Sequence, residues 1–135
     1  MSETVKPFKV RSFKDLDVWQ KAFELCRALY LATAMFPSEE KFGLSSELRK
    51  TARSVIWNIA EGAKRRSTVE YIRFLDIASG SAGELEAQIL LAESLGYFTP
   101  LDAARFLKTI DEVERMLGGL MRALEARKPI GAKPG

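Results

Sequence analysis

Apolar residues recur at alternating steps of three and four between residues 15 and 36, with polar residues between them. This spacing is typical of an amphipathic helix that buries one face. Pro37 follows at once and predicts the end of the helix. The predicted buried face consists of Leu16, Trp19, Phe23, Cys26, Tyr30 and Thr33.

A second helix is predicted to start at Ser45. Gly43 supplies a break before it, and Ser45 is a residue type that favours the N-cap position. Gly62 is expected to end this helix, because glycine is common where helices stop. Its predicted core stripe consists of Leu48, Ala52, Val55 and Ile59.

A third and a fourth helix are predicted after residue 66. Ser67 with Glu70 three residues later is a capping-box pattern that opens the third helix, and Gly96 stops it. Thr99 followed by Pro100 at the first helical position opens the fourth. The predicted inward residues are Tyr71, Leu75, Ala78, Ala82, Leu85, Ile89 and Ala92 on the third helix, and Phe106, Ile110, Val113, Leu117, Leu120 and Leu124 on the fourth.

The connections between these helices are short, which forces neighbouring helices to run antiparallel. No segment shows the period-two alternation bounded by hairpin turns that is typical of strands. The predicted fold is therefore all-α, an up-down-up-down antiparallel four-helix bundle over residues 13–126. Residues 1–12 and 127–135 lack periodicity and are predicted to be flexible tails.

The length of 135 residues and the hydrophobic content of 47% fit one compact domain. No apolar run approaches the roughly 20 residues that a membrane span requires. The start of the chain lacks the apolar region of a signal peptide. We therefore expect a cytoplasmic protein that makes no membrane contact.

The chain contains no His and a single Cys. It therefore lacks the commonest general base and metal ligand and cannot form an intrachain disulfide. Cys26 lies on an apolar helix face, which favours core packing. Glu61, Glu84 and Glu86 have no accompanying nucleophile-base pair or phosphate-binding glycine loop. We expect no enzymatic activity, no catalytic residue, no metal and no cofactor.

Trp57 lies about 180° from Leu48 on the second helix, so its ring faces away from the core. Three interpretations are open. The ring could be half covered by long basic side chains. It could anchor a subunit contact, because aromatic residues are enriched at interfaces. It could also be a platform on which bases of single-stranded nucleic acid stack.

Charge is segregated along the chain. Residues 45–75 hold seven basic and three acidic residues, a net charge of +4, whereas residues 76–104 hold five acidic residues and no Lys or Arg. Antiparallel pairing brings Arg49 and Lys50 level with Glu84 and Glu86, so these charges could neutralise one another within one chain. Alternatively, the basic face of one subunit meets the acidic face of the next, a heterologous contact that can close a ring.

The turn at Lys64, Arg65 and Arg66, termed the basic turn, has no nearby run of carboxylates. Such a cluster is often only solvated surface, but these side chains are the best candidates for phosphate contacts. The predicted nucleic-acid-binding set is Arg49, Lys50, Arg53, Lys64, Arg65 and Arg66.

Gly80 and Gly83 lie inside the third predicted helix, where each costs about 1 kcal/mol relative to Ala. A close approach between backbones would offset this cost. The approach could be to a neighbouring helix, which we favour slightly, or to another subunit. Gly118 and Gly119 in the fourth helix raise the same question.

Several segments in this order resemble a known family. They are FKDLDVWQKA (13–22), NIAEG followed by Arg66 (58–66), and FLDIASGSAGELEAQ (74–88) with LGY (95–97). Over about residues 13–125 the chain is similar to the small four-helix bundle proteins encoded in intervening sequences of bacterial 23S ribosomal RNA genes. That family includes the accessory variability determinant of diversity-generating retroelements.

The resemblance implies a homopentameric ring of bundles, a positively charged surface, and no enzymatic activity. In the retroelement member this surface binds nucleic acid and the reverse transcriptase. The resemblance also implies roles for Asn58, Glu61 and Gly62 where the second helix meets the third, and places part of the third helix in a packed or intersubunit seam. With Trp57 added, the predicted subunit interface is Trp57, Asn58, Glu61, Gly80, Ser81 and Glu84.

We therefore predict a non-enzymatic homo-oligomer, a pentamer by the resemblance, that binds RNA or DNA through a basic surface. A reverse transcriptase or a ribosomal RNA is the candidate partner. The alternative is a structural homo-oligomeric scaffold without affinity for nucleic acid.

Overall fold

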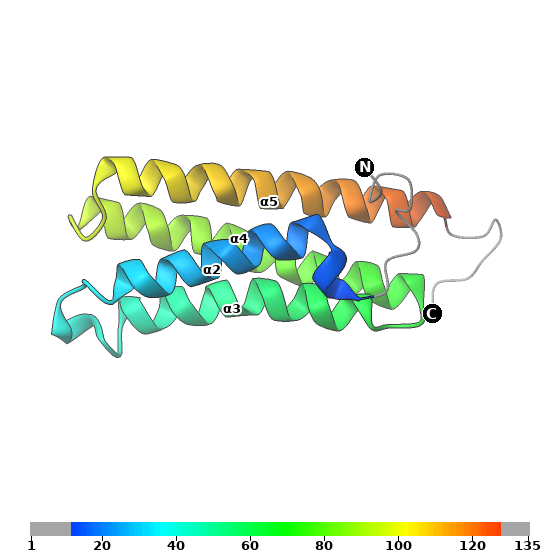
Figure 1. Cartoon of the computed structure of the whole chain (residues 1–135), viewed down its shortest axis with the longest axis horizontal. Coiled ribbons are helices and arrows are strands. Elements are labelled where there is room, and N and C mark those ends of the chain that lie inside the picture. Colours follow the sequence, from blue (N-terminus) through cyan, green and yellow to red (C-terminus); the bar gives the residue numbers. More distant parts are fainter. Residues whose placement is uncertain (1–11, 128–135) are drawn as a thin grey trace.

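The computed structural model describes residues 12–127 and folds them into four long helices joined by short turns (Figure 1). These residues contain no strand, so the predicted all-α fold is confirmed. None of their helices combines the length and the apolar character needed to cross a membrane. The elements are η1 (Phe13–Asp15), α2 (Asp17–Thr33), η2 (Ser38–Glu40), α3 (Leu44–Ala63), α4 (Thr68–Ser94) and α5 (Pro100–Arg127), where η marks a short 3-10 helix.

Successive helices run antiparallel, and the first and last helices, α2 and α5, are also neighbours. The α2–α3 and α4–α5 connections therefore lie at one end of the bundle, and the α3–α4 turn lies at the other end (Figure 1). This is the predicted up-down-up-down bundle. Ser12 caps η1 and Arg127 ends α5, and the rest of the two predicted tails lies outside the described residues.

The core is a continuous apolar layer to which all four helices contribute. The predicted stripes on α3, α4 and α5 are buried except for Tyr71 and Leu120, which are half-buried against the core. Leu48, Ile59, Leu75, Ile89 and Leu117 are fully buried. Burial of side chains of this size contributes roughly 1.5–3 kcal/mol each. Packing of these stripes therefore dominates the stability of the bundle.

Two of the predicted helix starts are confirmed by their capping bonds. The Ser67 hydroxyl accepts a hydrogen bond from the Glu70 backbone N–H at 3.2 Å. The Thr99 hydroxyl accepts one from the Asp102 backbone N–H at 3.1 Å. These side chains satisfy backbone donors that would otherwise have no partner in the first turn of α4 and α5.

The predicted N-cap at Ser45 is wrong. The helix α3 begins at Leu44, and its N-cap position is Gly43. The Glu40 carboxylate takes over the capping role, because it accepts a hydrogen bond from the Leu44 backbone N–H at 2.9 Å and another from the Tyr97 hydroxyl at 3.0 Å. A residue from the preceding 3-10 helix therefore caps α3 and ties the two connections at this end together.

The buried face of α2 is rotated from the predicted one. Phe23 is 41% exposed, while Leu25 and Leu29 are buried in its place. The reason is an aromatic cluster beside the core, in which the Trp19 ring lies 4.9 Å from Phe23 and 5.0 Å from Phe13. Cys26 and Thr33 are buried as predicted.

Gly62 does not end α3, which continues to Ala63. Gly62 instead allows α4 to pack closely against α3. A Cβ added at this position would lie 2.9 Å from the Phe74 Cβ and 3.1 Å from the Tyr71 Cδ1. Gly80 behaves in the opposite way. No atom lies within 4 Å of the position of its Cβ, so the expected tight packing inside the bundle is wrong there.

We expect Gly62→Ala to destabilise the fold by about 1–2 kcal/mol, because overpacking outweighs the gain in helix propensity. Gly119→Ala on α5 is the control, and it should stabilise the fold by about 1 kcal/mol because its new methyl group would lie 3.9 Å from the nearest side-chain atom, on the flexible Arg122. Urea unfolding followed by circular dichroism measures both. Equal effects of the two substitutions would contradict the assigned contact.

Candidate nucleic-acid interface

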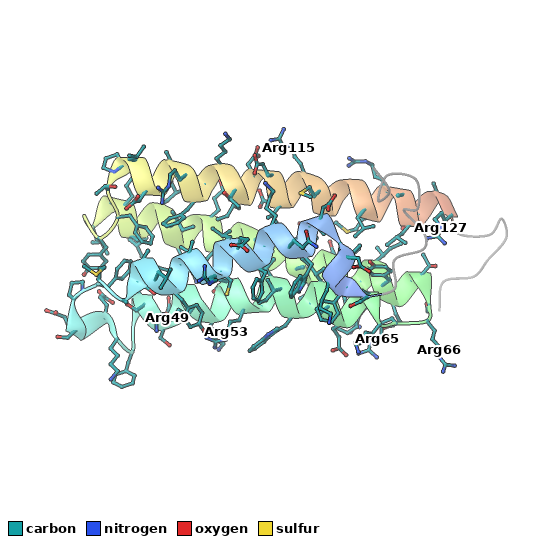
Figure 2. The ribbon with its side chains drawn as sticks, in the orientation of Figure 1. Arg49, Arg53, Arg65, Arg66, Arg115 and Arg127 are labelled. Atoms are coloured by element: carbon teal, nitrogen blue, oxygen red, sulfur yellow. The ribbon has the colours of Figure 1, made fainter. Side chains whose placement is uncertain are left out.

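The basic turn joins α3 to α4 at one end of the bundle (Figure 2). Arg65 forms an ion pair with Glu61 one turn earlier, and its guanidinium lies 4.7 Å from the centre of the Phe74 ring. Lys64 and Arg66 are exposed and make no hydrogen bond or ion pair through their side chains within residues 12–127. Two of the three cations therefore keep their charge available to a ligand.

Arg49 and Arg53 lie where α2 meets α3 and are held by Tyr30 (Figure 2). Arg49 donates to the Thr33 hydroxyl at 2.8 Å and to the Tyr30 carbonyl at 2.9 Å, with its guanidinium 4.6 Å from the centre of the Tyr30 ring. Arg53 donates to the Tyr30 hydroxyl at 2.6 Å and lies 5.4 Å from the centre of the Trp57 ring. Both guanidinium groups are half-buried and fixed in direction.

Sequence reasoning missed the role of Tyr30 and Thr33. The spacing put both on the predicted core face of the first helix, and this gave no sign that their oxygen atoms accept hydrogen bonds from arginines of α3. The sequence contains one sign of these contacts. Arg49 and Arg53 are four residues apart and therefore lie on the same side of α3, next to its core stripe.

The first of the two alternatives, neutralisation of basic α3 by acidic α4 within one chain, does not occur among the described residues. No ion pair joins Arg49 or Lys50 to Glu84 or Glu86 in residues 12–127. Lys50 and Glu84 are exposed. Glu86 instead lies close enough to Glu114 of α5 for its negative charge to raise the pKa of the Glu114 carboxyl. The charge segregation along the chain is therefore also present on the folded surface.

Three residues of the predicted subunit interface face outward from the α3 and α4 pair. Trp57 is 60% exposed. Gly80 and Glu84 are exposed on α4, and Gly80 faces open space. This placement is compatible with a contact to another molecule.

The other three residues of the predicted interface are used inside the chain. The Asn58 side-chain amide donates to the Ser54 carbonyl at 2.8 Å, and the Ser54 and Ser81 hydroxyls are 2.8 Å apart. Glu61 pairs with Arg65. Asn58 and Ser81 therefore belong to a polar seam between α3 and α4.

Burial raises the pKa of the Glu114 carboxyl, and the negative charges of Glu86 and Asp111 raise it further. Glu114 also faces the glycine side of α4, where an added Cβ at Gly83 would lie 3.9 Å from its carboxylate oxygen. Folding therefore disfavours the charged form of Glu114, which lies at the contact between α4 and α5.

An open groove of about 820 Å³ lies between α2 and α5. Its charged edge includes Lys21, which pairs with Glu112 at 3.0 Å. The one hydroxyl in its lining, that of Thr109, donates to the Arg105 carbonyl and is not paired with a base. Within the part of the chain that the structure describes, no group of three or more His, Cys, Asp or Glu residues is placed to hold a metal ion.

The chain is similar to a protein family and to solved structures. A family model described as "23S rRNA-intervening sequence protein" matches residues 14–119. A crystal structure described as a protein of unknown function from the S23 ribosomal protein family of Bacteroides thetaiotaomicron VPI-5482 superposes with a TM-score of 0.73 at 21% sequence identity. That match covers 78% of this chain and 98% of the other. The comparison with curated proteins found no match.

We expect Glu114→Gln to raise the melting temperature at pH 7. Because the pKa of Glu114 is raised in the folded state, the protonated carboxyl stabilises the fold relative to the charged form. This stabilisation is complete below the ordinary carboxyl pKa of about 4.3 and is lost as pH rises through the folded-state pKa. The advantage of the glutamine variant should therefore disappear below about pH 4. Thermal unfolding at several pH values tests this, with Glu24→Gln on the exposed side of α2 as the control. A pH-independent difference would contradict the assignment.

Proposed function

The chain belongs to the 23S rRNA-intervening sequence protein family, and we propose that it is a non-enzymatic, oligomeric accessory protein that binds RNA or DNA through a basic surface. The observation that carries this proposal is the basic turn. Lys64 and Arg66 are exposed there without a carboxylate partner among the described residues. Unpaired cations at a fixed position are what neutralisation of backbone phosphates requires.

The outer faces of α3 and α4 support self-association, because they carry exposed apolar groups and opposite charges. The face of α3 presents Lys50 and the ring of Trp57. The face of α4 presents Glu84, the open space at Gly80 and the side chain of Ile77, which is 42% exposed. A contact between α3 of one subunit and α4 of the next would bury the exposed tryptophan beside a glycine and pair opposite charges.

The angle between these two faces favours a small ring. Helices at neighbouring corners of a four-helix bundle face outward about 90° apart. In a closed ring of parallel bundles, the two contact faces of a subunit lie about 90° apart for four subunits and about 108° apart for five. A heterologous contact of α3 with α4 therefore fits a ring of roughly four or five subunits. We propose five, the number that the family resemblance implies.

Such a ring would repeat the basic turn once per subunit on one rim. Each turn offers few phosphate contacts, and a single copy would bind weakly. Several copies acting on one polynucleotide raise the affinity through effective concentration, without a strong individual site. A ribosomal RNA segment, or the nucleic acid handled by a partner reverse transcriptase, is the ligand class that we propose.

We expect the purified protein to bind a fluorescein-labelled single-stranded oligonucleotide with an affinity that falls roughly 10-fold or more between 50 mM and 200 mM salt. The triple variant Lys64→Glu, Arg65→Glu and Arg66→Glu should abolish this binding, as measured by fluorescence anisotropy. The control is Arg105→Glu, Lys108→Glu and Arg115→Glu, which changes the net charge equally on α5. No binding by the wild type, with its solution mass that of an oligomer, would favour a scaffold without nucleic-acid affinity.

Trp57→Ala should lower the solution mass, because the ring anchors the proposed subunit contact. Light scattering coupled to size exclusion measures this mass. Phe42→Ala is the matched control, since Phe42 is an exposed ring at the α2–α3 connection, away from the proposed contact. An unchanged mass for Trp57→Ala would remove Trp57 from the subunit interface.

A further inference from the structure

The two half-buried arginines of α3, termed the arginine pair (Arg49 and Arg53), differ from the other cations of the surface. Tyr30 positions both of them, one over its ring at 4.6 Å and one at its hydroxyl at 2.6 Å. Hydrogen bonds and ring contacts replace the water that would otherwise solvate these groups. Neither arginine makes an ion pair with a carboxylate in residues 12–127.

The segments of α2 and α3 around the arginine pair carry no acidic residue. Residues 48–60 of α3 include Arg49, Lys50 and Arg53 and no Asp or Glu. The facing segment of α2 and its continuation, residues 25–38, include Arg27 and again no Asp or Glu. Partly buried charges in proteins are normally paired, so two fixed guanidinium groups without a carboxylate indicate a site for an anion from outside the chain.

Each member of the arginine pair also keeps donors in reserve. Arg49 uses its Nε and Nη2 atoms on Thr33 and Tyr30, which leaves its Nη1 group without a hydrogen bond in the described chain. Arg53 uses only its Nη1 atom, which leaves Nε and Nη2. The two side chains start one helical turn apart and therefore project from neighbouring positions. Their free donors are available to an oxyanion without breaking the bonds that hold the two side chains.

We propose that the arginine pair is a preorganised oxyanion site that takes a backbone phosphate of a polynucleotide. It is distinct from the basic turn, which lies nearer the end of the bundle where α3 meets α4 (Figure 2). The proposal rests on the proposed function for the source of the phosphate, and on the geometry of Arg49, Arg53 and Tyr30 for the site itself. Guanidinium groups match phosphate oxygens with paired donors, which a lysine cannot do.

A phosphate of a polymer fits this site better than a single carboxylate from another protein. One carboxylate would neutralise only one of the two guanidinium groups, whereas successive phosphates of a strand can meet both.

The first experiment tests the site without a polynucleotide. The melting temperature of the wild type should rise by about 3 °C in 50 mM sodium phosphate relative to sodium chloride of equal ionic strength. The double variant Arg49→Lys and Arg53→Lys keeps the charge and loses the forked donors, so it should lose most of this shift. Arg115→Lys on α5 should retain the shift, since that arginine pairs with Asp111 at 2.9 Å. Retention of the full shift by the double variant would overturn the proposal.

The second experiment uses a labelled single-stranded oligonucleotide at low salt. The double variant should bind about tenfold more weakly than the wild type, at unchanged solution mass. Tyr30→Phe, which removes only the hydroxyl that holds Arg53, should bind several-fold more weakly, while Arg115→Lys should bind normally.

Each contrary result has a distinct meaning. Wild-type affinity in the double variant would overturn the arginine pair as a phosphate site and leave the proposed function in place. A drop in solution mass would overturn it in favour of a carboxylate from a neighbouring subunit. Protection by phosphate without oligonucleotide binding would overturn the proposed function and, with it, the polynucleotide as the source of the phosphate.

Discussion

The close contact between α3 and α4 at Gly62 sets the direction in which the other side chains of α3 point. Without a side chain at this position, Phe74 packs directly against the α3 backbone. The hydrogen bond between Ser54 and Ser81 continues the same seam toward the other end of the bundle. The core stripe and this seam occupy two sides of α3, so its third side, which carries Trp57, must face outward. The turn that follows Gly62 is anchored at the end of the bundle by the same contact.

The cations of this surface then separate into two kinds. Arg49 and Arg53 are half-buried and fixed by Tyr30, whereas Lys64 and Arg66 are exposed at the basic turn. Contacts between a cation and an aromatic ring contribute about 0.5–2 kcal/mol each, depending on desolvation. They can offset part of the cost of holding the arginines away from water, but they do not neutralise the charge. An anionic ligand would neutralise this charge, and a polynucleotide would contact both kinds of cation.

Periodicity and capping signals were enough to predict the four helices, because those features depend on residues close in the chain. Long-range packing was not predictable in the same way. The sequence predicts a helix end at Gly62 and tight packing at Gly80, yet only Gly62 lies against another helix. The sequence placed Phe23 on the buried face of the first helix, and Leu25 is buried in its place because Phe23 joins an aromatic cluster formed with η1. Tyr30 and Thr33 belong to the predicted face, but their hydrogen bonds to arginines of α3 depend on packing between two helices, which the periodicity of one helix does not describe.

We propose that the uncompensated cations of this bundle bind backbone phosphates. The most direct test is the dependence of wild-type oligonucleotide affinity on salt, measured by fluorescence anisotropy at several concentrations. Contacts with at least three phosphates predict a plot of log affinity against log salt with a slope of about −2 or steeper. Binding that does not change with salt, or no binding at the lowest salt, would contradict the account.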